Sequence, residues 1–351
     1  MEFGVVFATR IGEHDLVAQA ERLGFRQAWF YDSQMIYSDV YATMALAAHH
    51  TRRIRLATGV AVPTTRMAPV IAHSIATVHQ LAPGRVELGV GNGNTARLTM
   101  GLPPVPLARM KEELRTIRTL LDGGTATLRA EGLERPIRLL HQSQGFVRLE
   151  PRIPITLSAL GPKTLAYCGE ELDGHLTWGI SPDGLREART LLAEGARKAG
   201  RDPACVPSKG IFPTAVLARG ETAASPRILA SLASFITNYL HVQVEWGEGL
   251  LPPSPRLREV IERFRAHVER YPKEKRHLLL HEGHLVFARE DERDFLLPEI
   301  AETVAMIGEP DALIERIHAL EAAGLSHFAF QVTDDPIRQM NDFAELVMRR
   351  Y

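Results

Sequence analysis

Eight short apolar runs, each separated from the next by a helical pattern, constrain the fold of this chain more than any other feature. The runs lie at 3–8, 27–31, 54–60, 85–91, 153–158, 175–178, 210–218 and 326–332. Apolar periodicity predicts helices at 13–24, 39–50, 68–81, 107–121, 162–172, 182–200 and 309–323, with a last helix running to Tyr351. Apolar strands joined by helices indicate a parallel sheet covered on both faces. Eight such units favour a closed (β/α)8 TIM barrel, an α/β fold, over an open doubly wound sheet.

Two stretches interrupt this alternation, and we interpret both as insertions in a single domain spanning residues 1–351. Residues 124–150 follow Gly123-Gly124 and hold two short β-like runs, which predict a hairpin. Residues 220–300 are mostly helical, with a proline-rich break at Pro252-Pro253-Ser254-Pro255. Within 256–276 the apolar residues share one helical face, which is typical of an amphipathic helix.

The amino-acid composition limits the kinds of molecule that this protein can bind and the compartment in which we expect it. Lys and Arg number 41 and Asp and Glu number 42, so the formal net charge is −1. The protein therefore has no net positive charge that would attract nucleic acid or an anionic membrane. Cys168 and Cys205 cannot form a disulfide framework. No apolar run approaches the roughly 20 residues of a membrane helix, and the first residues lack the pattern of a signal peptide. We therefore expect a cytoplasmic protein.

In a barrel of this kind, active sites gather at the carboxyl ends of the strands. Those ends are rich in Gly, Asn, Ser and Thr and poor in acid–base groups. This composition favours a flat, polar cofactor that carries the chemistry, over a hydrolase with its own nucleophile. The candidate positions are Ala8, Asp32, Ser33, Thr58, Gly59, Val60, Ala61, Gly91, Asn92, Ser158, Ala159, Trp178 and Gln331.

The clearest local motif is Gly161-Pro162-Lys163-Thr164, which follows a predicted strand. Gly161 gives a tight turn and Pro162 fits the first helical position, so free N–H groups at the helix start could bind a phosphate. An ordinary strand-to-helix turn explains the same residues. A second glycine-rich stretch, 89–94, runs G-x-G-x-G and so does not match a dinucleotide fingerprint. Its glycines allow close approach either to a cofactor or to a neighbouring strand, and we favour a cofactor.

We predict no metal site from sequence spacing. His281-Glu282-Gly283-His284 is not the H-E-x-x-H pattern of zinc helices. His49-His50 ends a predicted helix, where the helix dipole explains it. Cys168 falls in an apolar helical pattern, as a small core residue would.

Several segments together resemble the luciferase-like monooxygenase superfamily, whose members depend on FMN or coenzyme F420. The matching segments are 28–33, 54–66, 76–93, 161–165, Asp173-Gly174 and 307–310. The chain is most similar to the branch that contains methylenetetrahydromethanopterin reductase.

The resemblance implies a reduced FMN or F420 lying across the strand ends, with a non-prolyl cis peptide within Gly59-Val60-Ala61 behind the ring. It also implies a phosphate site at Gly161, Pro162, Lys163 and Thr164, a cover over the substrate formed by 220–300, and a dimer or tetramer. Asp32, Ser33 and His284 are the catalytic candidates. Many F420-dependent members carry Asp-His where this chain has Asp32-Ser33. Serine cannot act as a base near neutral pH as histidine can.

The leading function is an oxidoreductase acting on a small organic substrate. FMN would activate O2, with a flavin reductase as partner, whereas F420 would transfer a hydride. Alternatives are a flavin storage protein without turnover and a metal-dependent barrel hydrolase. The hydrolase would need a His-x-His at a strand end, which the sequence lacks.

Overall fold

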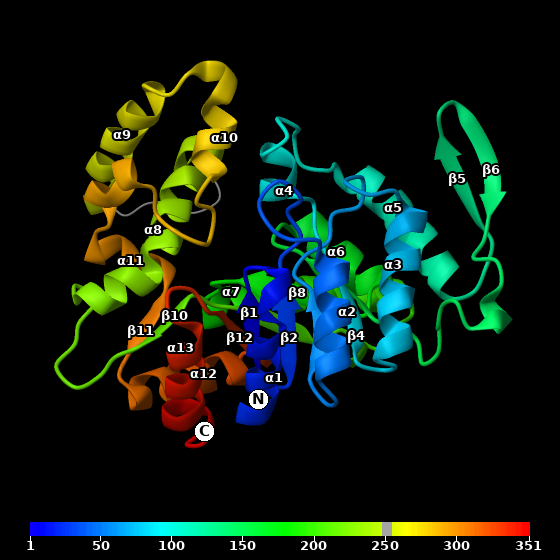
Figure 1. Cartoon of the computed structure of the whole chain (residues 1–351), viewed down its shortest axis with the longest axis horizontal. Coiled ribbons are helices and arrows are strands. Elements are labelled where there is room, and N and C mark those ends of the chain that lie inside the picture. Colours follow the sequence, from blue (N-terminus) through cyan, green and yellow to red (C-terminus); the bar gives the residue numbers. More distant parts are fainter. Residues whose placement is uncertain (248–254) are drawn as a thin grey trace.

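The computed structural model describes residues 1–247 and 255–351, and its centre is a closed barrel of eight parallel strands (Figure 1). The predicted fold is therefore confirmed. Around the barrel the strands run in the order β1, β12, β9, β8, β7, β4, β3 and β2. Their bounds are β1 Glu2–Phe7, β2 Gln27–Phe30, β3 Arg55–Thr58, β4 Val86–Val90, β7 Ile155–Ser158, β8 Gly174–Trp178, β9 Ser208–Ile211 and β12 Leu325–Gln331.

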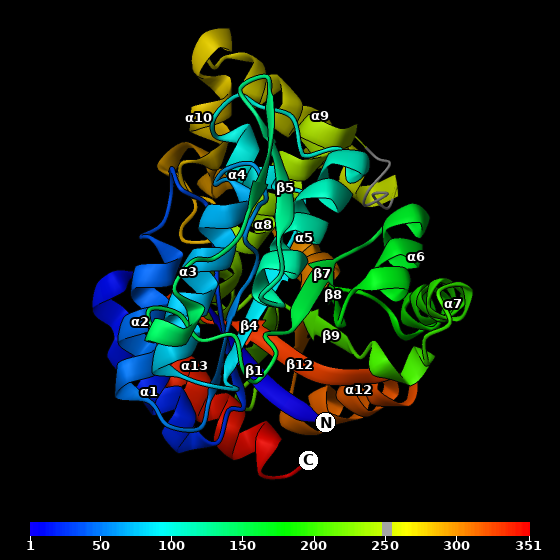
Figure 2. The ribbon, with the colours of Figure 1, turned by 90° about the vertical axis from the view of Figure 1, so that its right-hand side faces the viewer.

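Helices surround the barrel, and their ends follow local sequence signals (Figure 2). The Asp39 side chain accepts hydrogen bonds from two N–H groups at the start of α2, and Gly24 ends α1 with a φ of 101°. The helices are α1 His14–Leu23, α2 Val40–His50, α3 Ala68–Leu81, α4 Asn94–Leu98, α5 Leu107–Leu121, α6 Pro162–Glu171, α7 Pro182–Lys198, α12 Pro310–Ala322 and α13 Pro336–Phe343. Short 3-10 turns occur at Ile11–Glu13, Gln142–Gln144, Pro203–Cys205, Lys273–Lys275 and Glu290–Phe295, and a π-helical turn at Ala344–Met348.

The seventh predicted strand, 210–218, was too long. The barrel strand β9 ends at Ile211, and β10 (Thr214–Val216) pairs with β11 (Met306–Gly308) in a separate parallel pair. Pro213 lies between β9 and β10 and lacks the N–H that a continuous strand would need. The pair β10–β11 therefore joins the two ends of the long insertion at its base.

The two insertions stand on opposite sides of the barrel in Figure 1, the first at the right and the second at the left. The first holds the predicted hairpin, β5 (Ala126–Ala130) with β6 (Leu133–Ile137). The described residues of the second form the helices α8 Pro226–Trp246, α9 Pro255–Glu269, α10 Arg276–His281 and α11 Pro298–Val304, which stand over one side of the barrel. Pro252, Pro253 and Ser254 of the proline-rich break lie outside the described residues.

The helical insertion shares a hydrophobic core with the inside of the barrel. Val6, Trp29 and Leu176 from the strands belong to the same buried cluster as Ile236 of α8 and Phe264 of α9. The apolar face predicted for 256–276 is buried in this cluster. Because this core is continuous, the insertion packs as a cover on the barrel mouth. Among the described residues, no helix has both the length and the apolar character needed to cross a membrane.

Candidate active site at the carboxyl ends of the strands

A cis peptide joins Gly59 and Val60 directly after β3, as the resemblance implied. The bulge is held against β4, because the Ala61 N–H donates to the Gly89 carbonyl at 2.8 Å and the Gly91 N–H donates to the Ala61 carbonyl at 3.0 Å. A Cβ at Gly91 would lie 2.6 Å from Val60 Cγ2, and one at Gly89 would lie 2.0 Å from a backbone oxygen. These two glycines are therefore required by close contact with β3 and the bulge that follows it, and the close approach to a cofactor that we favoured stays a prediction.

Asp32 follows β2 and is buried on the rim with an arginine partner. Arg66 Nη1 donates to Asp32 Oδ2 at 2.6 Å, Arg66 Nη2 donates to Asp39 at 2.9 Å, and Gln34 donates to the other oxygen of Asp32 at 2.9 Å. Burial raises the pKa of the Asp32 carboxyl above its ordinary value, and the Arg66 charge offsets only part of this effect. Ser33 is buried beside it.

Tyr31, the neighbour of Asp32 in the chain, belongs to a group of aromatic side chains on the same rim. The Tyr31 ring stacks on Trp178 with centroids 6.0 Å apart and on Tyr37 at 5.7 Å. The Tyr31 hydroxyl donates to Gln331 Oε1 at 2.6 Å, and Gln331 Nε2 donates to the Leu285 carbonyl at 2.6 Å. The predicted candidates Trp178 and Gln331 are thus brought together, and Gln331 links the rim to the cover.

His284, in the cover, contacts the barrel rim. Its Nε2 lies 3.0 Å from the Thr95 hydroxyl in α4, and its carbonyl accepts a hydrogen bond from the Tyr37 hydroxyl at 2.9 Å. The other ring nitrogen, Nδ1, is buried and has no hydrogen-bond partner among the described residues. Burial, with His281 and His241 nearby, lowers the pKa of His284 well below its ordinary value. The ring is therefore neutral at pH 7 and has an unused nitrogen beside the barrel mouth.

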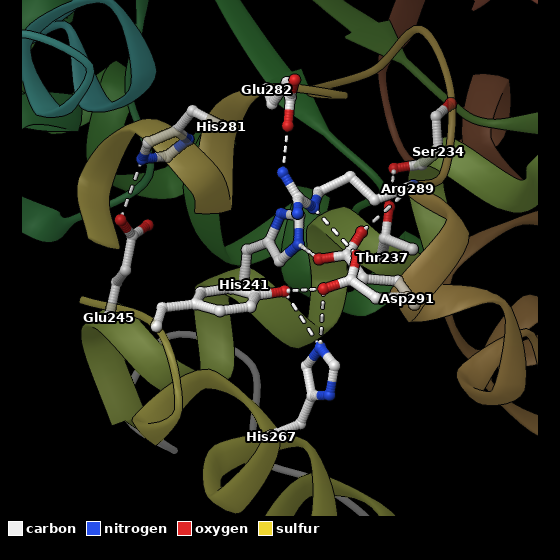
Figure 3. A network of polar contacts seen from close by, with 11 residues as sticks. Ser234, Thr237, His241, Glu245, His267, His281, Glu282, Arg289 and Asp291 are labelled. Atoms are coloured by element: carbon white, nitrogen blue, oxygen red, sulfur yellow. Dashed lines mark hydrogen bonds and ion pairs between the residues drawn. The ribbon is translucent and has the colours of Figure 1, made fainter. Parts of the chain in front are cut away.

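The cover also contains histidines held by carboxylates (Figure 3). Metal-binding and catalytic histidines are oriented in this way in many proteins, because a carboxylate that accepts from Nε2–H leaves the lone pair on Nδ1. The pairs are His241 with Glu292 at 2.7 Å, His281 with Glu245 at 2.9 Å and His267 with Asp291 at 3.2 Å. The rings of His281 and His284 are 5.8 Å apart.

The predicted phosphate turn begins α6 and is open. No side chain caps this helix start, and Gly161, Pro162 and Lys163 are exposed. A Cβ added to Gly161 would meet no atom within 4 Å. Pro162 has no N–H, and the Thr164 N–H donates to the Gly161 carbonyl at 3.0 Å, so the Lys163 N–H is the one left in this first turn to attract an anion. The Lys163 side chain adds positive charge.

The remaining candidates lie on the same rim with different exposures. Ala8 and Ser158 are half-buried, Ala159 is buried and Asn92 is exposed. The Thr58 hydroxyl donates to the Gly89 carbonyl at 2.7 Å, so it serves the barrel backbone.

Sequence reasoning missed four residues that shape this site: Arg66, Tyr31, Tyr37 and Thr95. Arg66 and Thr95 carried one usable signal, since each follows closely after a predicted barrel strand. Their partners are distant in the chain, so no local pattern could have paired Arg66 with Asp32 or Thr95 with His284.

The fold and the rim define a (β/α)8 barrel with its candidate site under a helical cover. The model of the luciferase-like monooxygenase family matches residues 1–327, and the chain belongs to that family.

Two relatives show how far the similarity extends. The 5,10-methylenetetrahydromethanopterin reductase of Methanolobus tindarius is 36% identical over 186 residues, which are 52% of this chain and 55% of that protein. The F420-dependent glucose-6-phosphate dehydrogenase of Kineococcus radiotolerans is 33% identical over 202 residues, 53% of this chain and 58% of that protein. The chain thus matches little more than half the length of these relatives.

Among solved structures, the coenzyme F420-dependent tetrahydromethanopterin reductase of Methanopyrus kandleri superposes with a TM-score of 0.70 at 20% identity. It covers 100% of this chain and 99% of its own. At this identity, the likeness supports the fold alone.

Proposed function

We propose that this protein is an oxidoreductase that binds coenzyme F420 across the carboxyl ends of its strands and exchanges a hydride with a small organic substrate. The observation that carries the proposal is the open start of α6, where the uncapped helix and exposed Lys163 offer an anion site on the rim. The F420-dependent relatives support this cofactor over FMN. FMN, with O2 as co-substrate and a flavin reductase as partner, is the second possibility in this family.

The residues present fit a flat cofactor with a phosphate-bearing tail. Gly161 and Lys163 would hold the phosphate, and the Gly59-Val60 bulge would support the ring. Bound F420 supplies a two-electron hydride donor or acceptor. Under the cover, the stacked rings of Tyr31 and Trp178 would help to exclude water from the reacting atoms.

We assign the acid–base role to His284, because Ser33 cannot perform it. A neutral imidazole with an unused, buried Nδ1 can accept a proton from a substrate hydroxyl while the hydride leaves the adjacent carbon. Thr95 orients the ring through Nε2. Asp32 would fix the rim through Arg66 near the reacting atoms.

The test is a titration of the purified protein with F420 and with FMN, followed by absorbance and fluorescence. We expect F420 to bind, and Gly161→Ala to weaken binding by about tenfold, because a methyl group would occupy the phosphate position. Gly12→Ala is the matched control, since its Cβ also meets no atom within 4 Å, but the residue follows β1, on the side of the barrel across from β7 and α6. Binding of FMN alone would favour oxygenation. Failure of both cofactors to bind, or equal behaviour of the two variants, would contradict the proposal.

His284→Asn separates catalysis from storage. We expect F420 affinity to stay unchanged, and hydride transfer with a panel of secondary alcohols to fall by about 10²-fold or more. A flavin or deazaflavin storage protein would show no substrate-stimulated turnover in either form.

A further inference from the structure

A second group of chemistry-bearing side chains lies on the outer helices, away from the barrel mouth. His14 and Asp15 are the first two residues of α1, and His50 is the last residue of α2. Figures 1 and 2 show these two helices side by side on the outside of the barrel. Each of these three side chains offers one ligand atom, and the three atoms lie within 4.8 Å of one another. Among residues 1–247 and 255–351, this is the group of His, Cys, Asp and Glu side chains close enough to share a metal ion.

The three side chains lie close together but do not form hydrogen bonds with one another. The rings of His14 and His50 have centroids 4.3 Å apart and an interplanar angle of 37°. His14 Nε2 lies 3.8 Å from Asp15 Oδ1, which is too long for a hydrogen bond. His14 Nδ1 is buried and has no partner in the described part of the chain. Lone pairs on two imidazoles and a carboxylate thus converge on one small volume.

We propose that His14, Asp15 and His50 bind a divalent transition metal of the Zn²⁺ class. Imidazole nitrogens and a carboxylate oxygen are common Zn²⁺ ligands, and water completes the coordination of such a three-ligand site. Hard cations such as Mg²⁺ prefer an all-oxygen set and would not select this group. His50 also lies at the C-terminal end of α2, where the partial negative charge of the helix favours a cation.

Simple ring packing is the competing explanation, and two observations count against it. His14 Nε2, the ring nitrogen that lies toward Asp15, makes no hydrogen bond in the described part of the chain, so it is available to a metal. Asp15 has an 87% exposed side chain, and no lysine or arginine among the described residues pairs with it. Sequence spacing did not reveal this group, because α1 and α2 come together only in the folded barrel.

The test is calorimetric titration of the purified chain with ZnCl2. We expect His50→Asn and Asp15→Asn each to lower the Zn²⁺ affinity of this site by about tenfold or more. Loss of even an outer partner of a metal ligand lowers metal affinity by about 10–100-fold. His49→Asn is the matched control, because it removes the neighbouring histidine and leaves the three ligands intact. Both substituted side chains are exposed, so the fold should survive.

Bound Zn²⁺ would also join α1 to α2, so the melting temperature of the wild-type chain should rise with ZnCl2 and not with MgCl2. The proposal is overturned if His50→Asn and Asp15→Asn bind Zn²⁺ as the wild type does, or if His49→Asn loses as much affinity as His50→Asn. None of these outcomes depends on the cofactor or substrate of the barrel mouth.

Discussion

Glu87, near the amino end of β4, and Asp32, beyond the carboxyl end of β2, are buried carboxylates with cationic partners, and they are held very differently. Glu87 lies in the second position of β4 and accepts from Lys209 Nζ at 2.5 and 2.6 Å, from the Thr156 hydroxyl at 2.5 Å and from Gln27 at 2.8 Å. Asp32, on the carboxyl rim, has Arg66 and Gln34. One carboxylate is enclosed by donors from three other strands, and the other is only partly satisfied.

The pKa values of these two carboxyl groups are therefore shifted in opposite directions. Burial acts to raise the pKa of Glu87, but the Lys209 charge and the hydrogen bonds around it outweigh burial and lower that pKa. Burial prevails at Asp32 and raises its pKa. The inner pair thus stabilises the closed barrel, while the rim pair keeps a carboxyl group whose charge is costly beside the candidate site.

Lys209→Met should have the largest effect. It leaves Glu87 buried without its countercharge, so we expect the free energy of unfolding to fall by about 3–5 kcal/mol. Urea denaturation followed by circular dichroism measures this. Lys198→Met is the control: it breaks a pair with Glu170 in which the lysine side chain is 79% exposed, and it should cost at most about 1 kcal/mol. A loss at Lys209 no larger than in the control would end the distinction between the two carboxylates.

Thr156→Val keeps the shape of the side chain and removes one donor to Glu87. A hydrogen bond to a charged group contributes about 1.5–3 kcal/mol, and we expect a destabilisation in that range. Thr190→Val provides the comparison, since that hydroxyl donates to the Arg186 carbonyl on the surface of α7. Equal losses in the two urea titrations would mean that the charge on Glu87 adds nothing.

The contrast also explains how far sequence reasoning reached. Apolar runs located all eight barrel strands, because a strand that is buried on both faces has apolar residues at consecutive positions. The same signal extended the seventh strand past Ile211, since residues beyond Pro213 are apolar too. Pro213 was the available sign that the ladder stops there.

Candidate positions at the strand ends followed from the strands themselves, whereas their partners did not. The ion pair of Asp32 with Arg66 and the contact of His284 with Thr95 join residues far apart in the chain. Such pairings arise from barrel closure and from docking of the cover. The apolar periodicity of a single segment does not predict these pairings.

Arg66→Met should cost less than Lys209→Met, although it also breaks a buried pair. Asp32 can take up a proton at little cost, because its pKa is already raised, so we expect a loss of about 1–2 kcal/mol. F420 affinity should fall as well if the rim pair shapes the cofactor site. Arg338→Met, which removes an exposed pair on α13, should change neither property. A loss as large as that of Lys209→Met would show that Asp32 stays ionised and unpaired.

Asp32→Asn should have the smallest effect on stability, within about 1 kcal/mol at pH 7, because burial already makes the Asp32 charge costly and Arg66 keeps its second partner, Asp39. Its informative property is the pH dependence. A carboxyl group with a raised folded pKa adds stability below its unfolded pKa and loses that contribution as pH rises through the folded value. Glu87, with a lowered folded pKa, adds stability above about pH 4.5 and loses it as pH falls through the folded value.

Urea titrations from pH 3 to 7 can therefore separate the two carboxylates. Relative to the wild type, Asp32→Asn should lose stability most at the acid end, and Glu87→Gln should lose it most at the neutral end. Since each substitution removes one titrating group, the two difference curves should slope in opposite directions. Curves that slope the same way would mean that the rim carboxylate is as well satisfied as the inner one, and that the strained charge we place beside the candidate site does not exist.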